Sequence, residues 1–407
     1  MKTLILFLDA ISATDFNEKN FPFLYKLAKE GAYGSTEIIP SCYHTEYSMF
    51  SGCLPIKHNV WTWYFLKENN SSFSKIKYIL PIAKIFDRIK ITKEINRKLI
   101  DIYLNLGRIL QGKTRFLKTY KIPLELIPYF EISVDKSYVD HNPLPVPTLF
   151  DIFRREGIKY SALDYPTIST NKRTSFYWGK NDLNQLNRVK KLLRKNSVVY
   201  AHVWDLDAIE HKYGLHSKEA LEHIKKLDNK VKEIVLTYKE ELRVIIFSDH
   251  GGCNVKKTKN ILPIIKKYSE RYFMGSTDVQ IWLKNLSQKE ELKKILKEED
   301  YLVYDEKNIE KELSIPYNRN FVGDLMVAVK PEEQLYPDFF RDTDKVASMH
   351  GYTKKTEELK GIFILNGFNV KTKNIKGMKL YDIMPTILAA MKIKIPGGCD
   401  GKSRVQS

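Results

Sequence analysis

The chain has 407 residues, of which 43% are hydrophobic, and this suffices for one large α/β domain with insertions or for two domains. Its four cysteines lack a C-x-x-C spacing, so they indicate neither a disulfide framework nor a structural zinc knuckle. The 67 Lys and Arg residues outnumber the 49 Asp and Glu residues and give a net charge of +18. This excess favours an anionic partner, namely a phosphorylated substrate, nucleic acid or an anionic membrane surface, although a Lys- and Ile-rich compositional bias explains it equally well.

No apolar run in the sequence approaches the roughly 18 residues of a membrane-spanning helix. The stretch before Asp9 is too short for a signal peptide, so we expect a cytoplasmic protein.

The N-terminal strand carries the first candidate residue. Residues 3–8 predict a buried strand that ends just before Asp9, although an Asp in this position is equally often a helix N-cap or turn residue.

Cys42 follows the second predicted strand. Residues 21–30 predict a helix and residues 33–39 a strand, and a second helix then begins near residue 47 and ends at Gly52. Cys42 therefore lies on a strand-to-helix turn, where backbone amides lower the pKa of a thiol and bind oxyanions. The alternative is an inert, half-buried small hydrophobe.

Residues 67–121 form a strongly basic segment. They contain 14 Lys and Arg residues against four Asp and Glu residues, so they supply +10 of the net charge. Apolar residues recur at helical spacing between the charges over residues 79–110, which predicts amphipathic helices inserted between strands as a cap over the site. The alternative is a solvated helical face that packs on the core.

Alternating helices and strands occupy the rest of the chain, which predicts an α/β fold. Two strands in this part end in candidate ligands. The strand at residues 197–204 precedes Asp207 and His211, whose four-residue spacing places both on one side of a helix. The strand at residues 244–248 runs directly into Asp249-His250 and two glycines. The predicted helices are 148–156, 182–195, 217–240, 288–297 and 382–391, and the other predicted strands are 160–163, 277–283, 324–329 and 361–365.

Seven residues at or near strand ends occur in the order seen in the alkaline phosphatase superfamily. They are Asp9, Cys42, Asp207, His211, Asp249, His250 and His350. The chain resembles that superfamily, most of all its type I phosphodiesterase and nucleotide pyrophosphatase branch. The supporting stretches are 4–9, 40–52, 207–214, 248–252, 350–352, 381–386 and 400–402.

The resemblance implies a central, mostly parallel sheet with helices on both faces. We expect residues 1–65 and 145–407 to form the catalytic core and residues 66–144 an inserted, mainly helical cap. Residues 254–345 are expected to hold a smaller insertion.

The resemblance also implies two divalent ions, zinc in most members of this branch, with manganese as the alternative. Asp207, His211 and His350 would hold one ion. Asp9, Asp249 and His250 would hold the other, which Cys42 would also touch as the nucleophile. Two such ions bind the attacking and leaving oxygens of a phosphoryl displacement.

The chain departs from the branch in two places. First, members of the branch have Thr or Ser at the position of Cys42. The related sulfatases have a cysteine at this position, which is oxidised to formylglycine. That conversion needs Pro or Ala two residues later and Arg four residues later, where this chain has His44 and Glu46. Second, members of the branch have an Asn that binds a phosphoryl oxygen, and this chain has Trp63 near that position. Asn59 is therefore a candidate for binding the oxygen, and Trp61, Trp63 and Tyr64 are candidates for an apolar wall beside the substrate.

We therefore expect a hydrolase of a phosphodiester or diphosphate bond in a nucleotide, sugar-nucleotide or lipid-linked substrate. The alternative within the superfamily is a phosphomonoesterase or sulfatase-like hydrolase. An alternative of another class is a basic protein that binds nucleic acid or a membrane surface without turnover. The sequence lacks the interleaved aromatic and basic residues of RNA-binding proteins, which argues against nucleic acid. The basic cap favours a peripheral position at the inner membrane surface.

Overall fold

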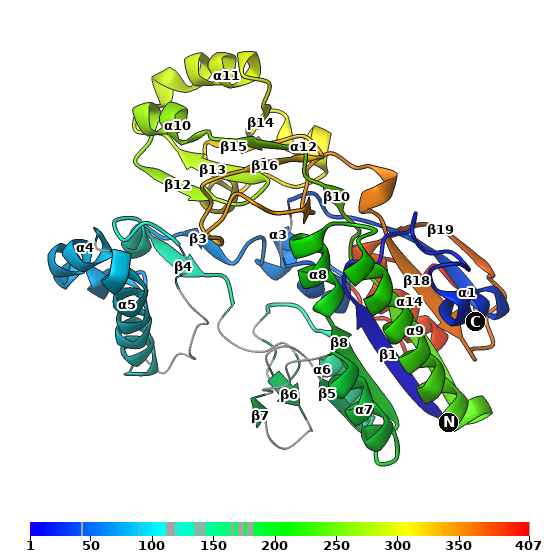
Figure 1. The fold of residues 1–407 in the computed structure, drawn as a ribbon. Helices are drawn as coiled ribbons and strands as arrows, with labels where there is room; N and C mark the ends of the chain where they lie inside the picture. The colour runs from blue at the N-terminus through cyan, green and yellow to red at the C-terminus, as the bar shows by residue number, and fades with distance from the viewer. Residues whose placement is uncertain are drawn as a thin grey trace.

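The structure is a computed structural model, and the central feature of the fold is a nine-stranded sheet (Figure 1). The described residues are 1–41, 44–88, 90–110, 119, 121–134, 139, 142, 144–163, 167–169, 175–176 and 182–406. The strand order is β19-β2-β18-β9-β1-β8-β5-β6-β7, and only β18 and β6 run against the other strands. The mostly parallel sheet that we expected is therefore confirmed. Its strands are β1 (Lys2–Leu8), β2 (Ala32–Glu37), β5 (Tyr160–Leu163), β6 (Thr167–Ser169), β7 (Ser175–Phe176), β8 (Val198–Val203), β9 (Leu242–Phe247), β18 (Gly361–Asn366) and β19 (Asn374–Lys379).

Helices cover both faces of this sheet, as predicted. Alternate side chains of β1 point to opposite faces. Leu4, Leu6 and Leu8 pack in one apolar cluster with α1, α7 and α9, whereas Ile5 and Phe7 pack in another with α2, α6 and α14. These helices are α1 (Pro22–Glu30), α2 (Thr45–Ser51), α6 (Leu149–Arg155), α7 (Asp182–Leu193), α9 (Lys218–Tyr238) and α14 (Ile383–Ala390). Most of the helices predicted in the core are thus present within a few residues of their expected ends.

A second sheet lies beyond the main one and is wholly antiparallel (Figure 1). Helices α10 and α11 pack on it through Ile265, Leu292 and Leu296. Its strands, in order, are β12 (Arg271–Met274), β13 (Asp278–Trp282), β15 (Leu325–Ala328) and β14 (Leu302–Tyr304), and the helices are α10 (Leu262–Tyr268) and α11 (Lys289–Glu298).

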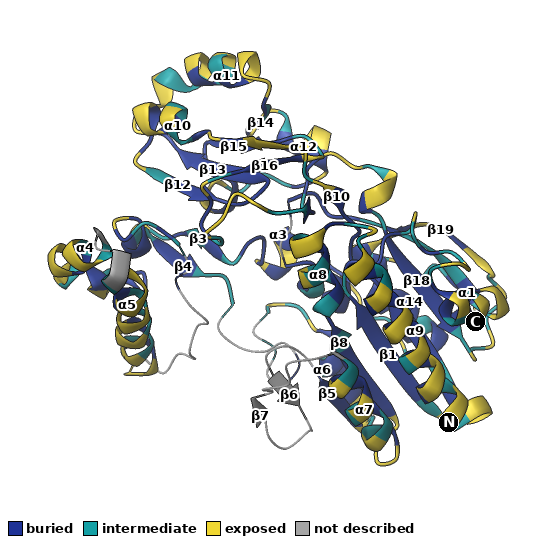
Figure 2. Ribbon diagram, in the orientation of Figure 1, coloured by how far each residue is buried: buried dark blue, intermediate teal, exposed yellow. Residues whose placement is uncertain are grey.

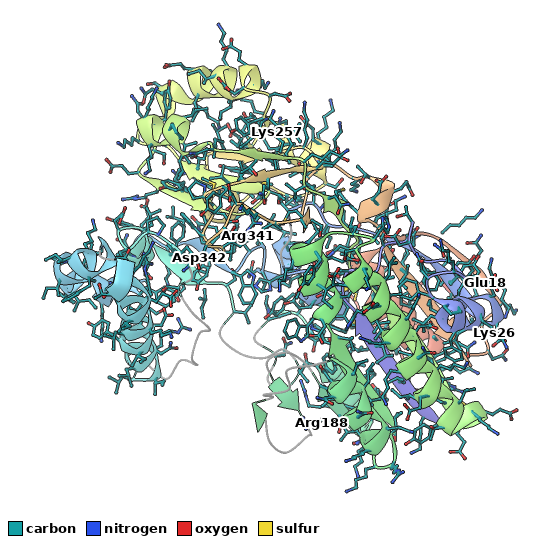
Figure 3. The ribbon with its side chains drawn as sticks, in the orientation of Figure 1. Glu18, Lys26, Arg188, Lys257, Arg341 and Asp342 are labelled. Atoms are coloured by element: carbon teal, nitrogen blue, oxygen red, sulfur yellow. The ribbon has the colours of Figure 1, made fainter. Side chains whose placement is uncertain are left out.

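The basic segment folds into two helices, α4 (Leu80–Arg88) and α5 (Lys90–Leu110), beside the short ribbon of β3 (Tyr64–Leu66) and β4 (Phe130–Ile132). Ile100 and Leu104 of α5 belong to the same apolar cluster as the second sheet. Lys121, which follows α5, donates its backbone N–H to Phe339 O at 2.8 Å and pairs with Asp342 at 2.6 Å, and Asp342 is labelled at this junction in Figure 3. The two segments that we predicted as insertions thus share one core, while their exact boundaries stay predictions.

Candidate metal centre

Parallel pairing of β1 with β9 brings three of the candidate ligands to one edge of the main sheet. Phe7 is in register with Phe247, so the chain segments that follow the two strands leave the sheet side by side. Asp9 follows β1, and Asp249 and His250 follow β9. Because ligands bind at the carboxyl ends of parallel strands, this edge is where a site is expected in such a sheet.

Gly251 permits the turn after His250. A Cβ at this position would stand 2.1 Å from Glu358 O and 2.6 Å from the Ser12 Cβ, so a larger residue cannot be accommodated without moving backbone. The chain then forms β10 (Cys253–Asn254), which pairs with β17 (Ser348–Met349). This pairing places His350 next to His250, about 100 residues away in sequence.

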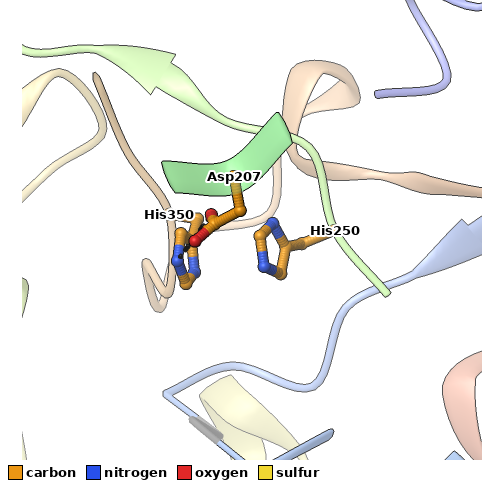
Figure 4. Close-up of side chains that lie close together, drawn as sticks. All are labelled: Asp207, His250 and His350. Atoms are coloured by element: carbon orange, nitrogen blue, oxygen red, sulfur yellow. Dashed lines mark ion pairs between the residues drawn. The ribbon is translucent and has the colours of Figure 1, made fainter. Parts of the chain in front are cut away.

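Asp207 and His211 both lie on α8 (Asp205–Tyr213), which begins after β8. The Nε2 atoms of His211 and His350 lie 3.4 and 3.5 Å from Asp207 Oδ1. The ring of His350 stacks on that of His250 at 3.8 Å between centroids, and Figure 4 shows Asp207, His250 and His350 converging on one point.

The structure forms two groups of metal-ligand type among the described residues: Asp207 with His250 and His350, and Asp9 with Asp249 and His250. His250 belongs to both groups, because its Nε2 lies 3.3 Å from Asp9 Oδ1 and 3.6 Å from Asp249 Oδ2 while its ring faces His350. Five of the seven predicted residues therefore lie close together, and the two groups that they form are next to each other.

The three carboxylates of the cluster shift the pKa values of its members. Burial, with the nearby Asp249 carboxylate, raises the pKa of Asp9 to about 7. Burial lowers the pKa of His250, but the carboxylates of Asp249, Asp9 and Asp207 outweigh it and raise that pKa to about 9. Burial and the neighbouring His250 and His211 hold the pKa of His350 well below its usual value. The three carboxylates therefore favour a positive charge between them, which a protonated His250 or a metal ion can supply.

The donor atoms fit divalent metal ions. Oδ1 of Asp9 and Oδ1 of Asp249 are buried and have no hydrogen-bond partner, which is costly unless a cation or water takes them. Nδ1 of His211 faces Ser348 O at 2.8 Å, and Nδ1 of His250 faces Gly251 O at 3.0 Å. A carbonyl only accepts, so each Nδ1 carries a proton and Nε2 is the atom of each ring that a metal ion could bind; at His250 the ion would take the place of the Nε2 proton that the nearby carboxylates favour.

Two predicted site residues remain to be accounted for. His211 is outside both groups by donor spacing, although its Nε2 borders Asp207, so its role as a ligand stays a prediction. Cys42 lies outside the described residues. The described residue Thr45, three positions later in the chain, donates its hydroxyl to Asp249 Oδ2 at 2.7 Å.

Sequence reasoning missed Thr45 and His202. His202 lies on β8, its Nε2 is 3.3 Å from Asp9 Oδ2, and its ring stacks on Phe7 at 4.1 Å. His202 could have been found in the sequence, because a polar residue within an otherwise apolar buried strand indicates a candidate site residue. Thr45 offers no comparable signal, because a Thr at the start of a helix is read as a capping residue.

The predicted aromatic wall is only partly present. Trp61 is buried against Phe321, and Tyr64 is buried against Phe273, so neither is available to a ligand. Trp63 is partly exposed and lies 4.1 Å from the His44 ring. Asn59 is exposed and ends a short helix with φ 61°, and no described contact joins it to the metal-ligand groups.

The type I phosphodiesterase / nucleotide pyrophosphatase family model matches residues 132–353, more than half of the chain. The chain therefore belongs to this family, which is part of the alkaline phosphatase superfamily, as its sequence motifs indicated. Membership indicates a hydrolase of the phosphodiesterase or pyrophosphatase type. The match contains five of the seven candidate residues, whereas Asp9 and Cys42 precede it. No curated protein matches the chain.

Proposed function

We propose that the protein hydrolyses a phosphodiester or diphosphate bond with two divalent ions, zinc or manganese, bound at the cluster described above. The observation that carries this proposal is the pair of ligand groups that share His250, with one buried carboxylate oxygen in Asp9 and one in Asp249 that accept no hydrogen bond. Asp207, His350 and His211 would hold one ion, and Asp9, Asp249 and His250 the other, with His250 also within reach of the first ion. Bound there, the ions would activate the nucleophile and neutralise charge on the phosphoryl and leaving oxygens.

The protein's own groups keep the ligands in position. Ser348 O holds the His211 ring, Gly251 O holds the His250 ring, and the Thr45 hydroxyl holds one oxygen of Asp249. Such contacts orient the donor atoms and set the protonation of each ring before substrate binds.

Cys42 is the proposed nucleophile. Its support is the chain position three residues before Thr45, which itself touches Asp249. A thiolate attacking phosphorus would form a thiophosphoryl intermediate and release the leaving alkoxide or phosphate, and water would then free the thiol. Cys42→Ala is expected to abolish turnover, and Cys42→Ser to retain part of it. Undiminished activity in Cys42→Ala would exclude this role.

The proposed substrate carries a phosphodiester or diphosphate in a nucleotide, sugar-nucleotide or lipid-linked molecule. A phosphomonoesterase remains the alternative within the superfamily. Rates on bis-p-nitrophenyl phosphate and on p-nitrophenyl phosphate separate the two, since a monoesterase prefers the second compound.

The test uses the full chain, stripped with EDTA and reloaded with zinc or manganese. We expect hydrolysis of bis-p-nitrophenyl phosphate that disappears with EDTA and returns with metal. Asp249→Asn should lower kcat/KM by at least about 100-fold, because it removes a ligand rather than an outer partner. Glu298→Gln, an exposed change on α11, is the matched control. Metal-independent activity, or full activity in Asp249→Asn, would refute the proposal.

A further inference from the structure

Exposed apolar side chains are concentrated on α4 and α5. Eleven of the 16 exposed large apolar residues in the described part of the chain lie between residues 78 and 110. They are Tyr78, Ile82, Ile85, Phe86, Ile95, Leu99, Ile102, Tyr103, Leu106, Ile109 and Leu110. Water-exposed apolar residues scattered singly are ordinary, but a contiguous group of this size on a soluble surface marks an interaction site.

The exposed residues of α5 form one stripe. Ile95, Leu99, Ile102, Leu106 and Ile109 follow one another at intervals of three or four residues, so they lie on one side of the helix. The opposite side carries Asn96, Ile100, Leu104 and Arg108, all of which are buried. Figure 2 shows exposed residues along most of the length of α5, which lies at the margin of the molecule.

The buried side of the hairpin of α4 and α5 makes specific polar contacts. The exposed stripe is therefore not a face that would otherwise pack in the core. Asn96 donates to Ala83 O at 2.8 Å, and Arg97 pairs with Asp87 through two contacts of 2.8 Å. Arg108, fully buried, contacts Glu131 of β4 at 2.9 Å. The tertiary contacts of α5 are therefore satisfied with its apolar stripe still facing outward.

Positive charge accompanies the stripe. Lys98 borders the stripe, and Lys93 is exposed on the other side of α5 near its N-terminal end; neither forms an ion pair with another residue of the described chain, and the segment 67–121 carries a net charge of +10. Two copies of the protein would bring these like charges together if the stripes met. A nucleic acid would leave the apolar residues uncovered. An anionic bilayer satisfies both features, because lysines meet the headgroups while apolar side chains enter the acyl boundary.

We propose that the α4–α5 hairpin docks on the surface of a bilayer rich in anionic phospholipid, with the stripe of Ile95, Leu99, Ile102, Leu106 and Ile109 inserted at the headgroup boundary. The helices lie in the plane of the surface. Consistent with this, no helix in the described ranges is both long and apolar enough to cross a membrane. Docking is independent of the hydrolytic activity proposed above.

Co-sedimentation with lipid vesicles tests the docking. The full-length protein should bind vesicles of phosphatidylcholine with about 30 mol% phosphatidylglycerol and bind pure phosphatidylcholine much more weakly. Leu99→Glu combined with Leu106→Glu should lower the partition coefficient at least about 10-fold, since both side chains are exposed and the fold does not need them. Lys93→Glu with Lys98→Glu should weaken binding to the anionic vesicles only.

Leu286→Glu is the matched control, since Leu286 is 61% exposed and lies outside the hairpin. It should bind as the wild type does, and circular dichroism melts should show that every variant is folded. Failure of the wild type to bind anionic vesicles would overturn the proposal, as would equal binding by the folded Leu99→Glu, Leu106→Glu protein. A wild-type dimer that this double substitution dissociates in sedimentation would assign the stripe to a second copy instead.

Discussion

Thr45 Oγ1 donates a hydrogen bond of 2.7 Å to Asp249 Oδ2, although 204 residues separate them in the chain. This contact joins the start of α2 to the loop after β9. It occupies Oδ2 of Asp249, whereas the other oxygen, Oδ1, is buried and has no hydrogen-bond partner.

Thr45→Val should therefore weaken metal binding without removing a ligand. We expect metal affinity about 10- to 100-fold lower, the range typical for loss of a partner that orients a ligand. Isothermal titration of the metal-free protein with zinc measures this change. Thr45→Ser keeps the hydroxyl and should bind as the wild type does. An unchanged affinity in Thr45→Val would show that the contact does not position Asp249.

The shared position of His250 predicts unequal effects on metal content. With two ions bound as proposed, His250→Ala should lower the metal content to fewer than one ion per chain, because both ligand groups lose a member. Asp9→Asn and His350→Ala should each leave about one ion, since each residue belongs to a single group. Elemental analysis after dialysis gives these numbers. Equal losses in all three variants would contradict a shared ligand.

His58 should make the folded state sensitive to acid. Its Nδ1 accepts from Val60 N–H at 3.2 Å and its Nε2 lies 2.8 Å from Ser48 Oγ, so the ring is held neutral. Burial, and secondarily the nearby His44, lowers the pKa of His58 to about 3. In the unfolded chain a histidine titrates near pH 6.5.

The stabilising effect of neutral His58 is therefore complete above pH ~6.5 and is lost as the pH falls toward ~3, by at most about 1.4 kcal/mol per pH unit. Urea denaturation at pH 7.5, 6 and 5 should show a shallower decline in His58→Gln than in the wild type, even if the variant is less stable at pH 7.5. Parallel declines in the two proteins would rule out this source of acid sensitivity.

The buried pair of Arg108 and Glu131 predicts strong coupling in stability. Their side chains are 0% and 6% exposed, and Nη1 lies 2.9 Å from Oε1. Arg108→Met should cost about 3–5 kcal/mol, because it leaves Glu131 without its main counter-charge in a buried site. Arg108→Met with Glu131→Leu should recover most of that loss. Denaturant melts of the four proteins measure the coupling, and additive losses would contradict it.

Periodicity and strand ends could be predicted from the sequence because they depend on local residue order. The strand before Asp249 and the helix predicted at residues 148–156 each depend on residues that are close together in the chain, and both form as expected. The order of the candidate residues along the chain likewise pointed to the alkaline phosphatase superfamily, and that resemblance implied that Asp9, Asp207, Asp249 and His350 are ligands of two ions.

Several relations depend on contacts between distant segments, which no local pattern encodes. The placement of His250 in both ligand groups follows from the pairing of β10 with β17, and the contact of Thr45 with Asp249 follows from the packing of α2 beside β9. Helical spacing predicted that α5 is amphipathic but left open which apolar residues are buried. That choice is made by Phe73, Arg108 and Glu131, whose packing covers one side of the helix and leaves Leu99 and Leu106 in water.

The sequence by itself thus determined the fold class, the family and the kinds of donor atoms available, because these depend on residue type, spacing and order. Only the tertiary structure decided which donors share a site and which apolar face remains uncovered, since burial and distance arise when segments far apart in the chain pack together.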